Sequence, residues 1–336
     1  MATRVAINGF GRIGRDVLRC VLAAPREDIE VVAVNDLVPA ETLAHLLEFD
    51  STYGHLGTPV HVRKSAMVVG TQTVHVTEEA DPARLPWGEH DVDVVIESTG
   101  RFRTREAAAA HLTAGARKVI VSAPGKGVDA TIVMGVNEDA YDPHRHDVVS
   151  NASCTTNCVA PMAQVLHRAF GVRRGFMTTI HSYTNDQSLL DGPHKDLRRA
   201  RSAAVNLIPT STGAARAIGE VLPELAGRLD GVSVRVPVED GSLTDLTVEL
   251  EEPATAGQVN RAFAEAASGG LKTVLRYTDR PIVSRDIVGD PASCVFDSSL
   301  TKADENLVKV FGWYDNEWGY AHRTLDLVEL VAAYLG

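Results

Sequence analysis

One stretch near the N-terminus restricts the fold of this chain more than any other. Residues 4–10 (RVAINGF) form a short apolar run that predicts a buried strand, and the run leads directly into the glycine-rich sequence GFGRIG. Residues 15–24 then repeat apolar side chains at helical spacing, and residues 29–36 (IEVVAVND) predict a second strand. Strand, glycine turn, helix and strand in this order are typical of a dinucleotide-binding unit.

The glycine turn supplies the chemistry that such a unit needs. Gly9, Gly11 and Gly14 match the pattern G-x-G-x-x-G, which permits a tight turn and a close approach of the backbone to a pyrophosphate. The helix that follows begins with backbone N–H groups that have no helical acceptor and can bind the negative charge. We therefore expect the pyrophosphate of a dinucleotide at this turn.

Asp36 closes the second strand about twenty residues after the turn, the usual spacing for such an acid. Its carboxylate is expected to accept hydrogen bonds from the adenosine ribose hydroxyls and to repel the additional phosphate of NADP, so the predicted cofactor is NAD. A glycine turn that binds nothing is the alternative, and it leaves this acid unexplained.

The rest of the first half keeps alternating strands and helices. The predicted elements are strands within residues 90–100, 118–124 and 130–137 and a helix within residues 106–116. This alternation predicts an α/β domain with a doubly wound parallel sheet and a ligand at the carboxyl ends of its strands. Ser98 and Ser122 follow two of these ends and are expected on loops beside the cofactor. Each of them is explained equally well as an ordinary polar residue where a strand ends and a loop begins.

Length and charge limit the remaining possibilities. The 336 residues favour two domains, and the net charge of −11 argues against nucleic acid as the main partner. The N-terminus lacks the apolar core of a signal peptide, and no later run has the length of a membrane span, so we expect a cytoplasmic protein without a membrane partner. The four cysteines are too few for a disulfide framework in a chain of this length.

The sequence SNASCTTNC, residues 150–158, contains the strongest candidate for a nucleophile. The apolar residues after it recur at helical spacing, and Ser153 is a natural N-cap, so Cys154 falls in the first turn of a helix. The N-terminal end of a helix stabilises a thiolate and lowers the pKa of the thiol. Pro161 conflicts with this prediction, because a proline inside a helix should kink or interrupt it.

The two cysteines have three other interpretations. A zinc site needs further Cys or His ligands at short spacing, and none is nearby. A disulfide between positions four apart in a helix has poor geometry. A buried structural thiol remains the interpretation for Cys158, whereas the polar surroundings of Cys154 offer no apolar packing surface.

A reactive thiol usually needs a base, and His181 is the best candidate. Residues 176–181 predict a strand that His181 closes, just before a polar loop. A histidine at the end of a strand can equally well be structural, so both roles remain open from the residues alone.

Several motifs in order identify a resemblance to the phosphorylating glyceraldehyde-3-phosphate dehydrogenases. The chain is similar to this family in NGFGRIGR, SNASCTTNC, HSYTNDQ, HKDLRRAR, IPTSTGAA, LPEL, VRVPV and WYDNEWGY. The resemblance runs from Arg4 to the C-terminus. It implies a NAD-binding domain over residues 1–152, a catalytic α+β domain with a largely antiparallel sheet over residues 153–317, and a C-terminal helix over residues 318–336 that packs back on the NAD-binding domain. It also implies a homotetramer with a long loop along the subunit interface.

The resemblance implies a reaction as well. Cys154 adds to the aldehyde of glyceraldehyde 3-phosphate to give a hemithioacetal, and His181 takes the hydroxyl proton while hydride passes to NAD. Inorganic phosphate then attacks the resulting thioester and releases 1,3-bisphosphoglycerate. The backbone N–H of Cys154 is expected to help to hold the developing oxyanion.

Further site residues follow from family matching. Arg12 and Ile13 are expected to offer backbone N–H groups to the pyrophosphate, and Asn316 to hold the nicotinamide carboxamide with Tyr320 near it. The residues expected to bind the substrate phosphate or the attacking phosphate are Ser153, Thr155, Thr184, Thr212, Gly213 and Arg235. One arginine of RRAR should join them, with Arg201 preferred and Arg199 as the second choice, because the arginine fork matches phosphate oxygens. No metal is expected.

Four positions depart from the family pattern: Ser182, Ser188, Glu239 and Asp240. They lie on or near loops that border the expected site, which suggests a specialised paralogue that tolerates thiol-directed inhibitors. The rival functions are those of an erythrose-4-phosphate dehydrogenase and of a non-catalytic NAD-binding or RNA-binding regulator. The STGAA sequence, residues 211–215, argues against the first, and the presence of Cys154 and His181 together with the acidic charge argues against the second.

Overall fold

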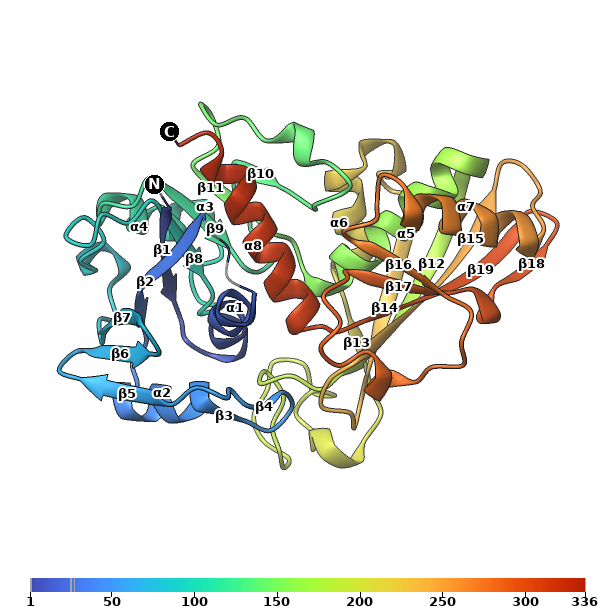
Figure 1. Cartoon of the computed structure of the whole chain (residues 1–336). Helices are drawn as coiled ribbons and strands as arrows, with labels where there is room; N and C mark the ends of the chain where they lie inside the picture. The colour runs from blue at the N-terminus through green and yellow to red at the C-terminus, as the bar shows by residue number, and fades with distance from the viewer. Residues whose placement is uncertain (1, 25, 27, 336) are drawn as a thin grey trace. The chain divides into compact units, whose positions relative to one another are not determined.

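The computed structural model describes residues 2–24, 26 and 28–335, and the chain divides into two compact units (Figure 1). Unit 1 contains Met1–Ile132, Glu138–Ala152 and Ala321–Gly336. Unit 2 contains Val133–Asn137 and Ser153–Tyr320. No described helix is both long enough and apolar enough to cross a membrane.

Unit 1 is built on a nine-stranded sheet in the order β10-β11-β9-β8-β1-β2-β7-β6-β5. Its strands are β1 (Thr3–Asn8), β2 (Ile29–Asn35), β5 (Val60–Arg63), β6 (Ala66–Val69), β7 (Gln72–Thr77), β8 (Val94–Glu97), β9 (Lys118–Val121), β10 (Ala130–Thr131) and β11 (Val148–Ser150). The short pair β3 (Phe49–Asp50) and β4 (Gly54–His55) lies outside this sheet. The helices are α1 (Arg12–Ala23), α2 (Ala40–Glu48), α3 (Arg105–Ala108) and α4 (Ala110–Thr113), with short 3₁₀ turns at Pro82–Arg84 and Glu138–Ala140.

Most of this sheet is parallel, as the alternating pattern predicts. The pairings from β10 to β7 are parallel, and only β6 and β5 join antiparallel at one edge. All residues of β8 and β9 are buried, and so are the last four of β1, because strands in a parallel sheet are covered on both faces. The Rossmann-type, doubly wound sheet of the fold prediction is confirmed.

Two predicted elements of unit 1 differ from the structure. The strand predicted within residues 130–137 ends at Thr131, and Val133–Asn137 form turns that belong to unit 2. The helix predicted within residues 106–116 is divided into α3 and α4, which meet at Ala109. Apolar runs such as TIVMGV do not distinguish a strand from a buried turn, because periodicity reports burial and not backbone geometry.

The last helix, α8 (Trp318–Ala332), joins unit 1 from Ala321 onward. Arg26 forms ion pairs of 2.9 Å with Asp326 and 2.7 Å with Glu329. The Asn151 amide donates a 3.1 Å hydrogen bond to the Thr324 hydroxyl. Arg26 and Asp326, three hundred positions apart in the sequence, are therefore in contact within unit 1.

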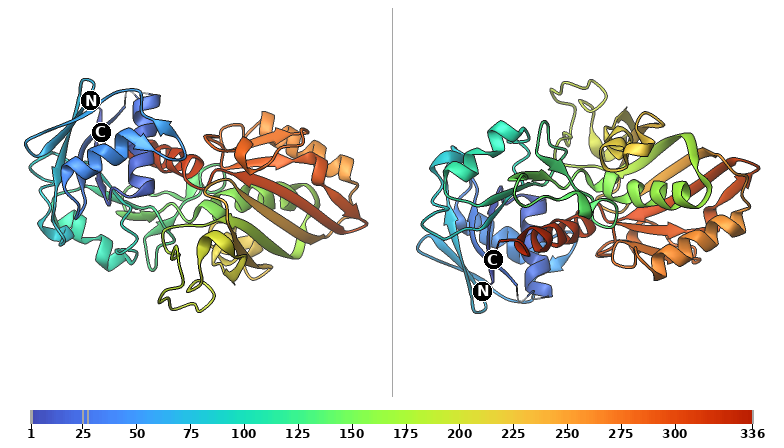
Figure 2. Two further views of the ribbon diagram at one scale, coloured as in Figure 1. Left: turned by 90° about the horizontal axis from the view of Figure 1, so that it is seen from below. Right: turned by 90° about the horizontal axis from the view of Figure 1, so that it is seen from above.

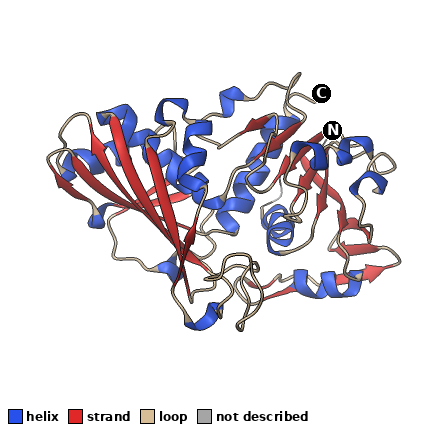
Figure 3. Ribbon diagram, turned by 180° about the vertical axis from the view of Figure 1, so that it is seen from behind, coloured by secondary structure: helices blue, strands red, loops and turns tan. Residues whose placement is uncertain are grey.

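Unit 2 contains an eight-stranded sheet in the order β13-β14-β12-β15-β19-β17-β16, with β18 paired to β19 (Figure 3). Its strands are β12 (Val172–Ser182), β13 (Ile208–Ser211), β14 (Leu229–Val236), β15 (Ser242–Leu250), β16 (Leu275–Thr278), β17 (Cys294–Asp297), β18 (Lys302–Asp304) and β19 (Leu307–Tyr314). Its helices are α5 (Cys154–Phe170), α6 (Ala214–Val221) and α7 (Ala256–Ser268), with 3₁₀ turns at Ala203–Val205, Pro223–Leu225, Ser284–Asp286 and Ser298–Leu300. Only β12–β14 and β16–β17 pair in parallel, so the largely antiparallel sheet is confirmed.

Helix α5 lies along this sheet and carries the SNASCTTNC sequence at its start (Figure 2). The helix is continuous through Pro161, so the proline does not interrupt it. Every residue from Thr155 to Leu166 is buried. The surrounding side chains hold the helix together although proline lacks the N–H that would close one backbone hydrogen bond.

The other face of the sheet and the loop after β12 expose apolar side chains. On the sheet, Phe176 is 74% exposed and Val232 is 50% exposed. The loop over residues 183–207 has only one 3₁₀ turn, and its exposed apolar residues are Leu189, Leu190, Leu197, Val205 and Leu207. Large exposed apolar areas are typical of protein interfaces.

Candidate active site

The glycine turn of unit 1 has the tight geometry that the sequence predicts. Gly9 has a φ of +92°, and a Cβ atom there would lie 2.6 Å from the backbone nitrogen of Thr99. A Cβ atom on Gly14 would lie 2.2 Å from the Gly9 carbonyl oxygen. At Gly11, by contrast, an added Cβ would meet no atom of the described residues within 4 Å. The packing of the chain does not require glycine there, so the open side of Gly11 fits a bound molecule.

Helix α1 begins immediately after this turn, with Gly11 as its N-cap and Arg12 and Ile13 as its first residues. No side chain caps the helix, and its first turn carries no acidic residue. The Arg12 guanidinium is turned to the side, where it pairs with Asp50 and lies 5.5 Å from the centre of the Tyr53 ring. The end of the helix therefore presents its positive dipole and backbone N–H groups, which suit an anionic pyrophosphate.

Asp36 lines a cavity of about 230 Å³ at the carboxyl ends of β1, β2 and β8. The cavity is lined by Asn8, Gly9, Gly11, Asn35, Asp36, Leu37, Glu79, Ala80, Ser98, Thr99, Arg101 and Phe102. Four of the cofactor-binding residues predicted from the sequence line this cavity: Gly9, Gly11, Asp36 and Ser98. Ser122 is not among them, and its hydroxyl instead donates to the Glu97 carbonyl oxygen at 3.1 Å.

Both oxygens of Asp36 already accept hydrogen bonds from the chain. The Phe10 N–H donates to one and the Leu37 N–H to the other, each at 2.7 Å. The carboxylate is thus held in one orientation beside the cavity, and its remaining lone pairs can accept hydroxyl groups of a ribose.

A buried polar network beneath this cavity was not anticipated from the sequence. The Glu97 carboxylate accepts from the Asn8 amide at 2.6 Å, from the Thr99 N–H at 2.8 Å and from the Thr99 hydroxyl, and it lies 3.0 Å from His111 Nε2. The Trp87 indole donates to His111 Nδ1 at 3.0 Å, so Nε2 carries the imidazole proton. In the sequence, the residues of this network are visible only as polar residues at the ends of apolar runs. This pattern does not indicate which of them hydrogen-bond to one another.

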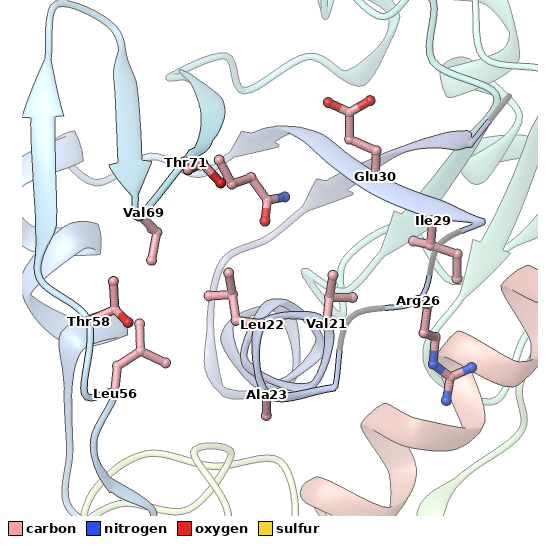
Figure 4. A pocket seen from close by; sticks show the side chains of 12 residues that line it. Val21, Leu22, Ala23, Arg26, Ile29, Glu30, Leu56, Thr58, Val69 and Thr71 are labelled. Carbon is pink, nitrogen blue, oxygen red and sulfur yellow. The ribbon is translucent and has the colours of Figure 1, made fainter.

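A second cavity of unit 1, of about 450 Å³, lies at the other end of α1 (Figure 4). Its walls include Val21, Leu22, Leu56 and Val69, and the side chain of Arg26 points toward α8. The lining also includes Arg26, Glu30 and Gln72, but neither a cysteine nor a histidine. Its position away from the glycine turn also separates it from the predicted dinucleotide site.

In unit 2 the thiol and the imidazole selected from the sequence lie together. Cys154 is the first residue of α5, and the N-cap Ser153 accepts a 3.0 Å hydrogen bond from the Thr156 N–H. The Cys154 sulfur lies 3.5 Å from Nε2 of His181, near the end of β12. Residues 27 positions apart thus form one thiol–imidazole pair.

The neighbours of His181 determine its tautomer. Nδ1 lies 2.7 Å from the Ser182 carbonyl oxygen and 2.9 Å from an Arg235 nitrogen. The same Arg235 nitrogen has acceptors at 3.0 Å in the Ser182 carbonyl and the Thr184 hydroxyl, so it does not need Nδ1. We assign the proton to Nδ1, which donates it to Ser182. The unprotonated Nε2 then faces the thiol and can act as a base.

The electrostatics of this pair correct one expectation. Burial raises the pKa of the Cys154 thiol to about 11, although Arg235 and hydrogen bonds from Thr155 act in the opposite direction. Burial, followed by the charge of Arg235, lowers the pKa of His181 to about 3. The expected lowering of the cysteine pKa is therefore wrong for this structure, because the loss of solvent outweighs the helix N-terminus. At neutral pH both groups are neutral, and the proton of the thiol has a base within reach.

Cationic and hydroxyl groups surround Asp186 on the loop after β12. Its carboxylate accepts from the Thr184 hydroxyl and, at 2.6 Å, from Arg199. Burial would raise the pKa of Asp186, but Thr184, Arg235 and Arg199 together lower it. Arg199 also donates to the Thr210 hydroxyl at 2.9 Å. This cluster was missed from the sequence, where Asp186 stands in the NDQ motif without a visible partner.

The two candidate arginines of RRAR have different environments. The Arg199 side chain is 20% exposed and belongs to the cluster around Asp186. The Arg201 side chain is 63% exposed and pairs at 3.0 Å with the equally exposed Asp191. This geometry favours Arg199, the second choice, over Arg201, and positions two apart in an irregular loop point in directions that the sequence does not specify.

The hydroxyl groups selected for phosphate binding are differently oriented. Thr155 is buried, and its hydroxyl lies 2.9 Å from the Tyr314 hydroxyl, so it is turned into the core. Thr212 accepts a 3.2 Å hydrogen bond from the Ala214 N–H, and Gly213 is the N-cap of α6. The N-terminal ends of α5 and α6 therefore each carry selected residues.

Asn316 is held by a buried serine. The Ser242 hydroxyl donates to the Asn316 side-chain oxygen at 2.7 Å, and both residues are at least 96% buried. Tyr320 is also buried, with 5% of its surface exposed.

The four departures from the family pattern have separate roles in the structure. Ser182 is fully buried, and its hydroxyl has no partner among the described residues. Ser188 accepts a backbone hydrogen bond from Ala203, and Glu239 pairs with Arg285 at the surface. Asp240 is buried and shares a side-chain hydrogen bond with Asp315. Only Ser182 adjoins the thiol–imidazole pair.

The fold and these groups define a dinucleotide-binding enzyme with a cysteine and a histidine in contact. Comparison with known proteins agrees with this class. Residues 3–105 match the family model described as glyceraldehyde 3-phosphate dehydrogenase, NAD binding domain, and residues 153–316 match the model of the C-terminal domain of the same family.

Relatives match over essentially their whole length. The glyceraldehyde-3-phosphate dehydrogenase of Geobacillus stearothermophilus is 57% identical over 334 residues, covering 99% of each chain. The corresponding Streptomyces coelicolor protein is 57% identical over 337 residues, covering 100% of each chain, and protein 1 of Streptomyces avermitilis is 57% identical over 331 residues, covering 98% of this chain and 99% of its own. The chain belongs to the glyceraldehyde-3-phosphate dehydrogenase family, and it is an NAD-dependent oxidoreductase.

Proposed function

We propose that this chain oxidises glyceraldehyde 3-phosphate with NAD and inorganic phosphate and forms 1,3-bisphosphoglycerate. The observation that carries the proposal is the 3.5 Å contact between the Cys154 sulfur and His181 Nε2 at the start of α5. A thiol beside an unprotonated imidazole can add to an aldehyde, because the imidazole accepts the proton as the sulfur attacks. Erythrose 4-phosphate is not favoured as a substrate.

Each step has a residue assigned to it. Cys154 adds to the aldehyde carbon, and the resulting alkoxide takes up a proton to give the hemithioacetal. His181 then removes the hydroxyl proton as hydride leaves the same carbon, and the carbon remains bound to sulfur as a thioester. The oxygen atom lies beside the first N–H groups of α5, which stabilise its negative charge. Phosphate attacks the thioester carbon, and Cys154 leaves as the thiolate.

The nicotinamide supplies the acceptor for the hydride. We assign Gly9, Gly11, Arg12, Ile13 and Gly14 to the pyrophosphate and Asp36 to the adenosine ribose. The open side of Gly11, the uncapped start of α1 and the fixed carboxylate of Asp36 support this assignment. Ser98, Ser122, Asn316 and Tyr320 complete the proposed cofactor contacts.

Two phosphate groups must be held, one on the substrate and one that attacks. Arg235, Arg199 and Thr184 are proposed for these anions because they already converge on Asp186. A phosphate oxygen could replace that carboxylate as the partner of both arginines. Ser153, Thr155, Thr212 and Gly213 are proposed for the second anion at the N-terminal ends of α5 and α6.

We further propose that the protein is a cytoplasmic homotetramer. Unit 1 and unit 2 correspond in this proposal to a NAD-binding domain over residues 1–152 and a catalytic domain over residues 153–317, with residues 318–336 as the closing helix. The exposed apolar residues of the 183–207 loop and of the sheet face support association of several copies.

An absorbance assay tests the function. NADH formation at 340 nm should require glyceraldehyde 3-phosphate and inorganic phosphate, and Cys154→Ser should abolish turnover while NAD still binds. Parallel assays with erythrose 4-phosphate should give a much lower kcat/KM. The proposal fails if the wild-type protein binds NAD but oxidises neither aldehyde, or if the Cys154→Ser variant retains its activity.

A further inference from the structure

Ser242 occupies a central place in unit 2 that the reaction described above does not explain. It is the first residue of β15, and its accessible surface is 0% exposed. β15 lies between β12, which carries His181, and β19, where Ser242 pairs with Tyr314. The residue before it, Gly241, has a φ of +87°, and a Cβ there would lie 2.3 Å from the Ser284 carbonyl oxygen. The turn that leads into Ser242 therefore has little freedom to move.

Two hydrogen bonds connect Ser242 to the residues around it. The backbone N–H of Ser182, directly after His181, donates to the Ser242 hydroxyl oxygen at 3.1 Å. The Ser242 hydroxyl donates to Oδ1 of Asn316 at 2.7 Å. A hydroxyl has only one proton, and the Ser182 N–H cannot accept it, so the proton is directed at Asn316.

This arrangement determines which way the Asn316 amide faces. Oδ1 is occupied as an acceptor inside the protein, so the NH₂ group is the one that remains to donate to a bound molecule. Rotation of the amide by 180° would place NH₂ against the hydroxyl of Ser242, which already receives one N–H from Ser182. The hydroxyl oxygen could accept this NH₂ with its second lone pair, but the hydroxyl proton would then lose Oδ1 of Asn316 as its acceptor.

We propose that Ser242 is a positioning residue for the cofactor: through Asn316 it fixes the donor that binds the nicotinamide carboxamide. The inference rests on the proposed function, in which Asn316 contacts that group. A carboxamide held by one fixed donor presents one face of the nicotinamide ring to the hydride. Ser242 also accepts a hydrogen bond from the backbone N–H that follows His181. The same side chain therefore contacts both the segment that carries the base and the residue that orients the nicotinamide.

The test is the Ser242→Ala variant of the full-length protein. We expect the KM for NAD to rise by about 3- to 10-fold, the range for one lost hydrogen bond between neutral groups. Substrate deuterated on the aldehyde carbon should place deuterium on one face of NADH with the wild type and on both faces with the variant, as seen by NMR. Asn316→Ala should show the same two effects, and Ser242→Ala should add nothing to them in the double variant, because Ser242 acts through Asn316.

A matched control is Ser233→Ala on β14. Ser233 is 2% exposed, and its hydroxyl has no partner among the described residues, so its removal tests the loss of a buried hydroxyl alone. This variant should keep the wild-type KM for NAD and a single labelled face of NADH.

The possible results separate the inference from the proposed function. If Ser242→Ala lowers only the melting temperature and leaves KM and the labelled face unchanged, while Asn316→Ala impairs both, the inference is overturned and the proposed function stands. An effect of Ser242→Ala that persists in the Asn316→Ala background also overturns it. If Asn316→Ala itself changes neither quantity, the assignment of Asn316 to the cofactor fails, and the inference fails with it.

Discussion

The contact between Cys154 and His181 shows how burial and charge act together on single residues. The thiol would be more easily ionised at an exposed helix N-terminus, but burial keeps it neutral, with a pKa raised to about 11. The imidazole is neutral for the same reason, and its Nδ1–H is held by the Ser182 carbonyl. A neutral imidazole that faces a neutral thiol can accept the proton of the thiol at the moment of attack.

His181→Asn should lower kcat by about 10²- to 10⁴-fold, the usual contribution of a general base. The amide can keep contacts with its neighbours but cannot accept the proton at neutral pH. Steady-state kinetics with glyceraldehyde 3-phosphate measure the effect, and NAD binding by fluorescence titration serves as the control. A variant with near-wild-type kcat would remove histidine from the mechanism.

Arg199 and Arg201 offer a matched pair of substitutions two positions apart. Arg199→Ala should raise the KM for phosphate or for the phosphorylated aldehyde by about 10- to 100-fold, because a charge-assisted hydrogen bond is lost. Arg201→Ala should change either KM by no more than about twofold, since its side chain is exposed and pairs only at the surface. Initial rates measured while each substrate is varied distinguish the two variants. Equal effects would contradict the placement of Arg199.

The inhibitor-tolerance hypothesis now depends on Ser182, the only departure next to the pair. Its buried hydroxyl, without a partner among the described residues, replaces a small apolar group in the family pattern. Ser182→Ala should increase the rate of inactivation by a thiol-directed reagent if the hydroxyl restricts access to Cys154. Unchanged inactivation kinetics would end the hypothesis.

At the scale of elements, Asp240 in the turn between β14 and β15 lies against Asp315, the residue directly after β19. Asp240 and Asp315 are each 1% exposed and share a side-chain hydrogen bond, so one of the two carboxyl groups must carry a proton. Burial, followed by the charge of Asp315, raises the pKa of Asp240 to about 9. Asp315 also accepts backbone hydrogen bonds from Gly289, Glu317 and Trp318. Burial also raises the pKa of Asp315, and the backbone hydrogen bonds that its carboxyl group accepts organise the chain that leads into α8.

The raised pKa makes stability depend on pH in a defined direction. Between about pH 4, where an unfolded Asp ionises, and about pH 9, the folded chain binds one proton that the unfolded chain does not. The folded state therefore loses stability as the pH rises through this range. Asp240→Asn supplies a permanent hydrogen-bond donor, so the variant should exceed the wild type by about 1–3 kcal/mol near pH 8.

Melting temperatures measured from pH 5 to pH 9 test this. The difference between Asp240→Asn and wild type should grow with pH, whereas the neighbouring Glu239→Gln, an exposed position paired with Arg285, should follow the wild-type curve. Parallel curves for all three proteins would show that the two acids do not share a proton.

At the scale of the whole molecule, exposed apolar residues predict association. Phe176, on the sheet face, is 74% exposed. The loop over residues 183–207 exposes five large apolar side chains, each by 69% or more. Phe176→Asp should reduce the mass in solution from a tetramer to a smaller species, as measured by light scattering. Tyr334→Ser, an exposed aromatic residue in unit 1, is the control and should leave the mass unchanged. A monomeric wild type would contradict the predicted tetramer.

Much of the fold could be predicted because its signals are local. The glycine turn, the two flanking strands and Asp36 follow one another within about 33 residues, so their sequence pattern already contains their geometry. The N-cap Ser153 and the start of α5 are likewise local, since capping depends on three or four consecutive residues. Where the pattern reported only burial, as in residues 130–137, the predicted strand was too long, because the observed strand ends at Thr131.

Among the site residues, the sequence by itself determined which groups exist and where helices begin: the glycine turn, Asp36, and Cys154 behind its cap. Tertiary structure alone decided what these groups touch. It brought His181 to the thiol, turned Arg199 rather than Arg201 toward Asp186, and placed Ser242 between Ser182 and Asn316. It also reversed the expected change in the cysteine pKa, because the loss of solvent depends on every element packed around the sulfur and not on the helix that carries it.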